Sequence, residues 1–364
     1  MKLLSQILVV LVTTGFSVHA ESAPEVSERF VDVDNDVSLR VIEAGQLASG
    51  ATLVLIPGWS TTADVWREQI NRFARTYRVI SFDPRSQGKS TITTDGNTPE
   101  TRAQDLHTLL GLLSVRRPVL VGWSQGVEDI AAFINRYGTG DLSGIVLVDA
   151  AISPGAEGIP ARNAQQTATL FETFTTYQAH QQEYLANTMR AIVSKPRSND
   201  AVEDLVTMGL KTPPDIGVAM RIADSFTVNR MPALKKINCP TLSIASAKSG
   251  GLAQQQAQAK QISRAHFETI EDAAHAVFLD QPDRFNELVM TFVGKLAPPA
   301  SDLHPAPFVE IDQPVTPSLV EQYRTAPKIV KPRQRHQRVA RVRSFWDKLR
   351  YGWIVETPPY VKKR

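Results

Sequence analysis

Short apolar runs alternate with longer amphipathic segments along most of this chain, and the alternation limits the folds open to it. The apolar runs are Val37 to Ile42, Thr52 to Ile56, Val79 to Phe82, Val119 to Gly122, Ile145 to Val148 and Thr241 to Ala245. Runs of that length suit strands covered on both faces. Helical spacing marks Ala63 to Ala74, Pro99 to Leu113, Val127 to Tyr137, Leu252 to Ile262 and Asp283 to Phe292. This order predicts an α/β fold with a doubly wound, mainly parallel sheet.

The alternation of strand-like and helix-like segments stops between Ala151 and Met231, which indicates an inserted helical cap at about 151–231. The stretch has no run typical of a strand, and its apolar residues recur at helical spacings: Leu170, Phe171, Phe174, Tyr177, Tyr184, Leu185, Met189 and Ile192. A cap at this point would lie over the carboxyl edge of the sheet, where ligands bind in such folds. We expect its aromatic residues to form the core of the cap, because a helix must bury one apolar stripe.

The N-terminus has the pattern of an export signal. Lys2 precedes the apolar run Leu3 to Val18, which ends at the small-residue site Val18-His19-Ala20. This order predicts a signal peptide over residues 1–20 and a periplasmic or secreted protein. An N-terminal membrane anchor is the alternative, but the run is short for a bilayer span and is interrupted by polar residues.

The C-terminal part differs in composition from the rest. Proline-rich sequence follows Leu296, so we place the end of the 21–296 domain near Lys295 and an extension over 297–364. From Ala326 onward twelve Lys and Arg face two acidic residues, a net charge of +10 that leaves −7 elsewhere in a chain of net +3. Apolar residues recur there every three or four positions: Val339, Val342, Trp346, Leu349 and Trp353.

This tail pattern predicts a basic amphipathic helix that binds an anionic membrane surface. A solvated charge run, or a segment that docks on the acidic remainder of the chain, are the alternatives. Nucleic acid is not an expected partner, because the protein is expected to be exported.

The sequence Gly122-Trp123-Ser124-Gln125-Gly126 carries the strongest chemical signal. It lies between a predicted buried strand and a predicted helix. A sharp strand-to-helix turn strains its central residue, and the glycines leave room for it. Ser124 is therefore the candidate nucleophile; an inert serine in a turn is the alternative.

A serine hydroxyl needs a base to take its proton, and His275 is the candidate. It follows a late strand within Ala273-Ala274-His275-Ala276, whose small neighbours let the imidazole approach another side chain. His107 falls inside a predicted helix, His180 in the cap and His266 at a strand start. The placement of His275 favours a general base over a structural histidine.

The carboxylate that orients the base is not where it would be expected. The loop after Thr241 to Ala245 contains no acidic residue, whereas the strand before it ends in Asp149. We therefore predict that Asp149 orients His275, although an aspartate there could also cap the chain reversal. Glu271 and Asp272 are the fallback, too close to His275 in sequence to reach its far nitrogen easily.

Two backbone N–H groups must stabilise the developing oxyanion. Gln125 follows the nucleophile and offers one, and Trp59, in the loop Pro57-Gly58-Trp59-Ser60, is predicted to offer the other. Another strand is followed by Asp83-Pro84-Arg85-Ser86-Gln87-Gly88-Lys89-Ser90. There we expect Asp83 and Arg85 to form an ion pair that stabilises the turn.

Together these motifs resemble the α/β-hydrolase superfamily, from about Phe30 to Leu296. The resemblance is greatest to the capped branch of non-haem chloroperoxidase-like esterases, haloalkane dehalogenases and epoxide hydrolases. It implies that branch's fold, and members of the dehalogenase group place their acid where Asp149 stands. Ser124 occupies the position where dehalogenases and epoxide hydrolases need Asp, which disfavours both activities. Pro57 replaces the histidine that often precedes the oxyanion glycine.

The expected function is cleavage of a carboxylic ester, or a related small acyl compound, through an acyl-Ser124 intermediate. Perhydrolysis or C–C bond cleavage on the same residues is the alternative among enzymes, because a shared fold does not fix the reaction. A non-catalytic binding protein is the third alternative, suggested by the missing acid after Ala245. We expect no cofactor and no metal, since neither a HExxH motif nor paired cysteines occur; Cys239 stands alone.

Overall fold

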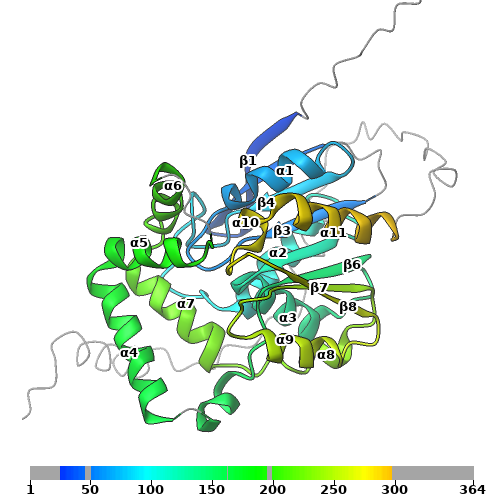
Figure 1. The fold of residues 1–364 in the computed structure, drawn as a ribbon. Coiled ribbons are helices and arrows are strands. Elements are labelled where there is room, and N and C mark those ends of the chain that lie inside the picture. The colour runs from blue at the N-terminus through cyan, green and yellow to red at the C-terminus, as the bar shows by residue number, and fades with distance from the viewer. Residues whose placement is uncertain (1–24, 46–50, 162, 195–198, 297–364) are drawn as a thin grey trace, which may run out of the picture. The chain divides into compact units, whose positions relative to one another are not determined.

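A computed structural model of the chain describes residues 25–296, apart from 46–50, 162 and 195–198. Within these residues the centre is an eight-stranded sheet in the order β1-β2-β4-β3-β5-β6-β7-β8 (Figure 1). The strands are β1 (Val26–Asp34), β2 (Val37–Ala44), β3 (Thr52–Ile56), β4 (Arg78–Phe82), β5 (Val119–Trp123), β6 (Gly144–Val148), β7 (Thr241–Ser246) and β8 (Ala265–Ile270). The pairs β1–β2 and β2–β4 are antiparallel. All other neighbouring strands, from β4 to β8 in the sheet order, pair in parallel. The predicted doubly wound, mainly parallel sheet is confirmed.

The predicted strands correspond to β2 through β7, with bounds within two residues of those expected. β1 has no continuous apolar run, because most of its side chains are exposed. An exposed edge strand needs no continuous apolar sequence, so the signal that identifies central strands is missing from it.

Alternate residues of the central strands pack into different layers. In β3, Leu53 and Leu55 belong to one buried cluster, whereas Val54 and Ile56 belong to the other. Successive side chains of a strand point to opposite faces, so a strand with both faces covered must be apolar throughout. This is the physical reason for the short continuous apolar runs in the sequence.

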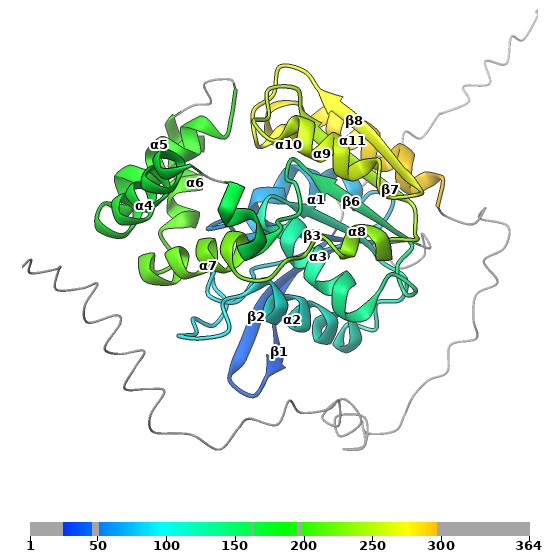
Figure 2. The same ribbon diagram turned by 90° about the horizontal axis from the view of Figure 1, so that it is seen from below.

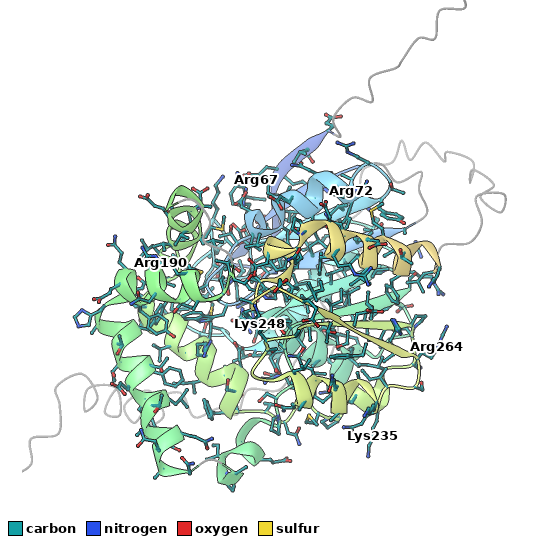
Figure 3. All side chains as sticks on the ribbon, viewed as in Figure 1. Arg67, Arg72, Arg190, Lys235, Lys248 and Arg264 are labelled. Carbon is teal, nitrogen blue, oxygen red and sulfur yellow. The ribbon has the colours of Figure 1, made fainter. Side chains whose placement is uncertain are left out.

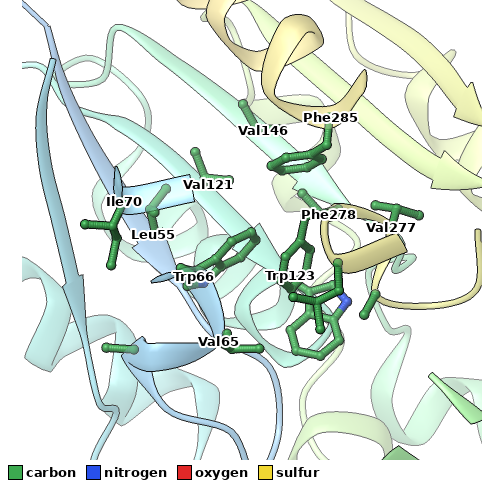
Figure 4. Close-up of a cluster of buried hydrophobic side chains, with 14 of the residues drawn as sticks. Leu55, Val65, Trp66, Ile70, Val121, Trp123, Val146, Val277, Phe278 and Phe285 are labelled. Atoms are coloured by element: carbon green, nitrogen blue, oxygen red, sulfur yellow. The ribbon is translucent and has the colours of Figure 1, made fainter. Parts of the chain in front are cut away.

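Helices cover both faces of the sheet (Figure 1, Figure 2). They are η2 (Ala63–Trp66), α1 (Arg67–Phe73), α2 (Pro99–Leu112), α3 (Gln125–Tyr137), α8 (Ala233–Lys236), α9 (Leu252–Ala259), α10 (Val277–Asp280) and α11 (Pro282–Gly294). The layer of α1, α10 and α11 contains a dense aromatic group in which Trp66 stacks on Phe278 with ring centroids 4.0 Å apart (Figure 4). Trp123 meets Phe278 edge to face at 5.1 Å, so this layer packs directly beneath the end of β5.

The described part of the inserted segment between β6 and α8 contains helices and no strand. Its helices are η3 (Gly155–Ala161), α4 (Ala164–Ala179), α5 (Gln181–Ala191), α6 (Asn199–Gly209) and α7 (Pro214–Phe226), which lie together beside the sheet (Figure 2). Phe174, Tyr177, Leu185 and Met189 are buried, as expected for a cap core. Phe171 differs from that expectation, because it is 62% exposed.

The expectations for residues 1–20 and 297–364 lie outside the described part of the chain. Among the described residues, none of the helices combines the length and the apolar character that a membrane span requires.

Candidate active site

Ser124 occupies the turn between β5 and α3 with a backbone that few residues other than glycine adopt. Its φ is 54° and its ψ is −115°, and its N–H donates a 3.1 Å hydrogen bond to the carbonyl of Val148. The flanking glycines are needed for space: a Cβ on Gly122 would lie 2.5 Å from the Gly126 carbonyl oxygen, and one on Gly126 would lie 2.7 Å from that of Ile56. The strained serine turn predicted from the sequence is therefore present, and such strain is typical of functional positions.

His275 lies in the loop between β8 and α10, beside the end of β5. The Trp123 indole N–H donates a 3.0 Å hydrogen bond to the carbonyl oxygen of His275, and the two ring centroids are 5.3 Å apart. Trp123 immediately precedes Ser124, so this contact fixes the histidine loop to the serine turn. The carboxylate of Asp280 supports the loop by accepting the Ala274 N–H at 2.8 Å.

Asp149 and His275 meet across 126 residues of sequence. The Oδ2 atom of Asp149 lies 2.8 Å from Nδ1 of His275, and the aspartate side chain is only 2% exposed. A carboxylate can only accept, so Nδ1 carries the proton of a neutral imidazole and Nε2 keeps a free lone pair. The arrangement thus supplies an imidazole with a basic nitrogen directed away from the acid.

The backbone and partners of Asp149 explain how it reaches His275. Its φ is 45°, so the chain turns sharply at the end of β6. Its Oδ1 accepts the Ser246 N–H at 2.9 Å and lies 3.4 Å from the Gln255 amide nitrogen. The fallback acids do not take this place: Asp272 has an 81% exposed side chain and lies near Lys248, labelled in Figure 3, and Glu271 is exposed.

The loop after β3 packs against the serine turn. A Cβ on Gly58 would lie 3.3 Å from Cβ of Ser124 and 2.9 Å from the Trp123 ring, so only glycine allows this approach. Trp59 follows directly and is 9% exposed. The predicted oxyanion residues Trp59 and Gln125 therefore flank Ser124 from two elements, the loop after β3 and the first turn of α3.

The same loop is fastened to the cap. The Trp59 indole N–H donates to the carbonyl of Gly217 in α7 at 2.9 Å, and its ring packs 4.8 Å from that of Tyr177. The hydroxyl of Ser60, whose φ is 55°, donates to the carbonyl of Gly209 at the end of α6 at 3.0 Å. The sequence predicts only a backbone role for Trp59, and these side-chain contacts of the loop are not expected from it.

Gln87 makes further contacts that are not expected from the sequence. It is fully buried, and its Nε2 donates to the carbonyl oxygens of Gly58 at 3.1 Å and Thr61 at 2.7 Å. Its Oε1 accepts from Nε2 of Gln125 at 2.8 Å. The available signal was its position just after β4, where the carboxyl end of that strand reaches the same edge of the sheet as β3 and β5.

The expected ion pair between Asp83 and Arg85 is wrong. Arg85 forms a bidentate pair with Asp105 of α2, with both distances 2.6 Å. Asp83 instead accepts the backbone N–H groups of Ala63 and Lys89, each at 2.8 Å. Asp83 does stabilise the turn, but through backbone donors, because Arg85 is directed toward a neighbouring helix.

Two other histidines contact side chains away from Ser124. His107 stacks on Tyr137 with ring centroids 4.0 Å apart, and His266 lies 2.6 Å from a carboxylate oxygen of Glu268 on the edge strand β8. Within the described residues, no group of three or more His, Cys, Asp or Glu side chains is arranged to hold a metal ion.

A buried cluster of charges joins the cap to α2 and α3. Arg102 of α2 binds Asp129 of α3 at 2.8 Å and Asp224 of α7 at 2.7 Å. Burial raises the pKa of Asp129 to about 7, although Arg102 opposes the shift. Removing Arg102 would leave Asp129 and Asp224 without their shared partner in the interior.

Arg230, at the exit from the cap, extends this cluster. It forms a bidentate pair with Glu100 at 2.8 and 3.0 Å, and its guanidinium lies 3.6 Å from Glu128. Glu128 also accepts the N–H of Ser153, at the entry to the cap, at 2.8 Å. Burial raises the pKa of Glu128 to about 8. Both connections of the cap therefore converge on one carboxyl of α3, the helix that follows Ser124.

The chain matches a known protein family over most of the described residues. The sequence model of the alpha/beta hydrolase family matches residues 53–288, which include the serine turn, Asp149 and His275. This chain belongs to that family. A putative non-heme chloroperoxidase of Synechocystis sp. is 25% identical to this hydrolase over 260 residues, which is 68% of the present chain and 92% of the relative.

The chain is also similar to one protein over a shorter stretch of sequence and to another in its structure. A bifunctional esterase/perhydrolase of Acinetobacter calcoaceticus is 32% identical over 94 residues, 26% of this hydrolase and 34% of that protein. The crystal structure of a bromoperoxidase from Bacillus anthracis superposes with a TM-score of 0.67 at 23% identity, covering 74% of this chain and all of that one. The family membership and the hydrolase fold expected from the sequence are thus confirmed.

Proposed function

We propose that this hydrolase cleaves small carboxylic esters, or related acyl compounds, through an acyl-Ser124 intermediate. The observation that carries the proposal is the 2.8 Å contact between Asp149 and His275, held beside the strained Ser124 turn by Trp123. A serine at the end of β5, a histidine in the loop after β8 and a carboxylate at the end of β6 are the groups that a serine hydrolase uses to activate its hydroxyl, which supports the proposal.

The reaction follows from the roles of these groups. The Ser124 oxygen attacks the ester carbonyl carbon while Nε2 of His275 takes the hydroxyl proton. The backbone N–H groups of Trp59 and Gln125 stabilise the oxyanion that forms. The carbon–oxygen bond to the alcohol then breaks, and His275 returns the proton to the departing oxygen. Water, activated by the same nitrogen, attacks the acyl-enzyme and releases the acid and free Ser124.

Asp149 acts on His275 and not on the substrate. As a buried acceptor for Nδ1–H, it selects the tautomer whose Nε2 can take a proton, and it stabilises the imidazolium that results. The alternative of a non-catalytic binding protein was motivated by the missing acid after β7. That motive is removed, because β6 supplies a carboxylate to His275.

Perhydrolysis is the second candidate function, favoured by the similarity to the Acinetobacter protein named as an esterase/perhydrolase. In that reaction hydrogen peroxide replaces water as the acceptor of the acyl group, and the product is a peracid. The acyl-Ser124 intermediate is common to both reactions, so they differ only in which nucleophile reaches the carbonyl in the second step.

A labelling experiment tests the proposal. A fluorescent fluorophosphonate should label the wild-type protein at Ser124 and should not label Ser124→Ala. Ser81→Ala is the matched control, because Ser81 is fully buried and its hydroxyl donates to the carbonyl of Leu55 at 3.0 Å. Labelling of Ser124→Ala, or no labelling of the wild type, would contradict the proposal. Turnover of para-nitrophenyl esters of increasing acyl length, with and without hydrogen peroxide, then identifies the acyl class and acceptor.

We also propose that the protein is exported by residues 1–20 and that the basic tail binds anionic membrane surfaces. Both segments lie outside the described residues, and the support is their sequence pattern: the apolar run before Ala20, and the apolar and basic periodicity after Ala326.

A further inference from the structure

The buried carboxamide of Gln87 links the two elements that flank Ser124. Its Nε2 donates to the carbonyl oxygens of Gly58 and Thr61, which bracket the turn containing Trp59. The carbonyl of Gly58 also accepts the Thr61 hydroxyl at 2.9 Å, which closes the same turn. Gln87 therefore binds this turn at two carbonyls, in addition to the cap contacts of Trp59 and Ser60.

The hydrogen-bond network fixes which end of each amide is which. Both partners of one Gln87 terminal atom are carbonyl oxygens, so that atom must be the nitrogen. The Oε1 of Gln87 is then an acceptor, and the Gln125 atom 2.8 Å away must be a donor nitrogen. The donors and acceptors are therefore fixed along this link: Gln125 donates to Gln87, and Gln87 donates to the turn that contains Trp59.

We propose that Gln87 is a positioning residue that sets the separation of the two oxyanion donors, the backbone N–H groups of Trp59 and Gln125. The inference rests on the proposed acyl-enzyme function, since it assigns a role in stabilising that reaction's oxyanion. Gln87 touches neither substrate nor nucleophile. It acts through the Gly58–Thr61 turn on one side and through the first residue of α3 on the other.

The physical reason is the geometric tolerance of such a site. Oxyanion donors stabilise the transition state only when they are directed at the position of the developing charge, and errors of about 1 Å can cost about 100-fold in rate. Without the Gln87 carboxamide, the carbonyl oxygens of Gly58 and Thr61 lose a buried donor. The hydrogen bond that connects this turn to Gln125 of α3 is lost as well. The contact between His275 and Asp149, and the hydrogen bond from Trp123 to the His275 carbonyl, do not involve Gln87 and would remain.

Gln87→Leu tests the proposal, because leucine fills the space and removes all three hydrogen bonds. We expect kcat for para-nitrophenyl acetate to fall about 10- to 100-fold with KM changed less than about threefold, as for weakened oxyanion stabilisation. Binding of trifluoroacetophenone, whose adduct with serine places an oxyanion in the same hole, should weaken by a similar factor. Fluorophosphonate labelling should remain detectable, since Ser124 and His275 are unchanged.

Gln258→Leu is the matched control. Gln258 of α9 is also buried, and its carboxamide bridges the N–H and carbonyl of Ile152 with two 2.8 Å hydrogen bonds away from the oxyanion turn. It should lower the melting temperature but leave kcat and trifluoroacetophenone binding near wild type. A Gln87→Leu protein that resembles this control would show that Gln87 is merely structural and would overturn the inference.

Gln125→Leu provides a second route if Gln87→Leu does not fold. It removes only the link between the two amides and leaves the contacts of Gln87 with Gly58 and Thr61. We expect kcat and trifluoroacetophenone binding to fall together by about 10-fold, because one donor loses its link to the other. Unchanged values in this folded variant would overturn the inference. Absence of wild-type turnover and labelling would instead refute the proposed function.

Discussion

The backbone N–H of Ser246, at the end of β7, donates a 2.9 Å hydrogen bond to Oδ1 of Asp149, at the end of β6. The loop after β7 thus supplies a donor that orients an acid from the neighbouring strand, and contains no acid of its own. Ser246 also connects this point to the histidine loop, because its hydroxyl donates to the carbonyl of Ala273 at 2.7 Å. The two loops and Asp149 are therefore held as one unit.

The first prediction concerns Ser124 and His275. Ser124→Ala and His275→Ala should each lower kcat by several orders of magnitude, and the double variant should lose little more, because such residues act as a unit. Steady-state kinetics on the best para-nitrophenyl ester measures this. Activity that survives in either single variant, once contamination is excluded, would contradict the assigned roles.

The second prediction concerns the acid. Asp149→Asn should fold normally and lower kcat by a factor on the order of 10³ to 10⁴, because an amide can hold the imidazole in the wrong tautomer. Asp272→Asn is the control and should have near wild-type kcat, since Asp272 is exposed beside Lys248.

Ser249→Asp extends this test. Ser249 lies in the loop after β7, and its hydroxyl is 3.0 Å from the Gln255 amide nitrogen that also approaches Asp149. Placed in the Asp149→Asn background, the new carboxylate should recover part of kcat. Normal turnover by Asp149→Asn alone would show that Asp149 does not orient the base.

The third prediction concerns the buried charge cluster. Arg102→Met should lower the free energy of unfolding by about 3 to 5 kcal/mol, because Asp129 and Asp224 lose their shared partner in the interior. The surface change Arg284→Met, which removes a 2.8 Å pair with Glu287, should cost less than about 1 kcal/mol. Denaturant unfolding of both variants gives the comparison, and equal small losses would show that the cluster is not important for stability.

The fourth prediction is a dependence of stability on pH. Glu128 has a pKa raised from 4.5 to about 8, so the folded protein keeps a proton that the unfolded chain loses above 4.5. Its stabilising contribution is complete below pH 4.5 and is lost as the pH rises through about 8. The pKa of the neighbouring Asp129 is also raised, so its contribution changes with pH in the same direction. The nearby guanidinium of Arg230 acts in the opposite sense, because it lowers the pKa of Glu128.

Glu128→Gln tests this sign. The amide can still accept the Ser153 N–H but cannot ionise, so the fall in melting temperature over that pH range should become shallower. Glu287→Gln is the control, because Glu287 has a 63% exposed side chain and should leave the profile unchanged. Identical profiles for wild type and Glu128→Gln would contradict the prediction.

The fifth prediction concerns the basic tail. The mature protein should bind vesicles containing phosphatidylserine, with an affinity that falls as salt concentration rises, because screening weakens attraction to the headgroups. Truncation after Thr325 should abolish this binding and leave kcat for a soluble ester nearly unchanged. Equal vesicle binding by the truncated protein would refute the membrane role, and a large loss of kcat would favour docking of the tail on the catalytic part.

The central sheet could be predicted from sequence because burial on both faces leaves a direct mark, a continuous apolar run, in each strand. Asp149 could be predicted for a related reason: β5, β6 and β7 are parallel neighbours, so residues at their carboxyl ends share one edge. Strand order thus restricts where an acid for His275 can come from, even when the usual position lacks one.

Side-chain partners inside the site could not be predicted in this way. Sequence proximity predicts that Arg85 pairs with Asp83, but the direction of Arg85 is set by its bidentate pair with Asp105 of α2. Gln87 and Gln255 bind groups contributed by distant segments, and a glutamine carries no sequence pattern that identifies its partners. Such contacts depend on where loops lie in space, which apolar periodicity does not report.

The attachment of Trp59 and Ser60 to the cap limits how this hydrolase can diversify or be redesigned. Both residues share one short loop, and they bind the carbonyls of Gly217 and Gly209 in two different cap helices. A cap transplanted from a relative would present these acceptors elsewhere, so the grafted helices would disturb the loop beside the nucleophile. If a cap is grafted to change the substrate preference, the Gly58–Thr61 loop must therefore be transferred together with it.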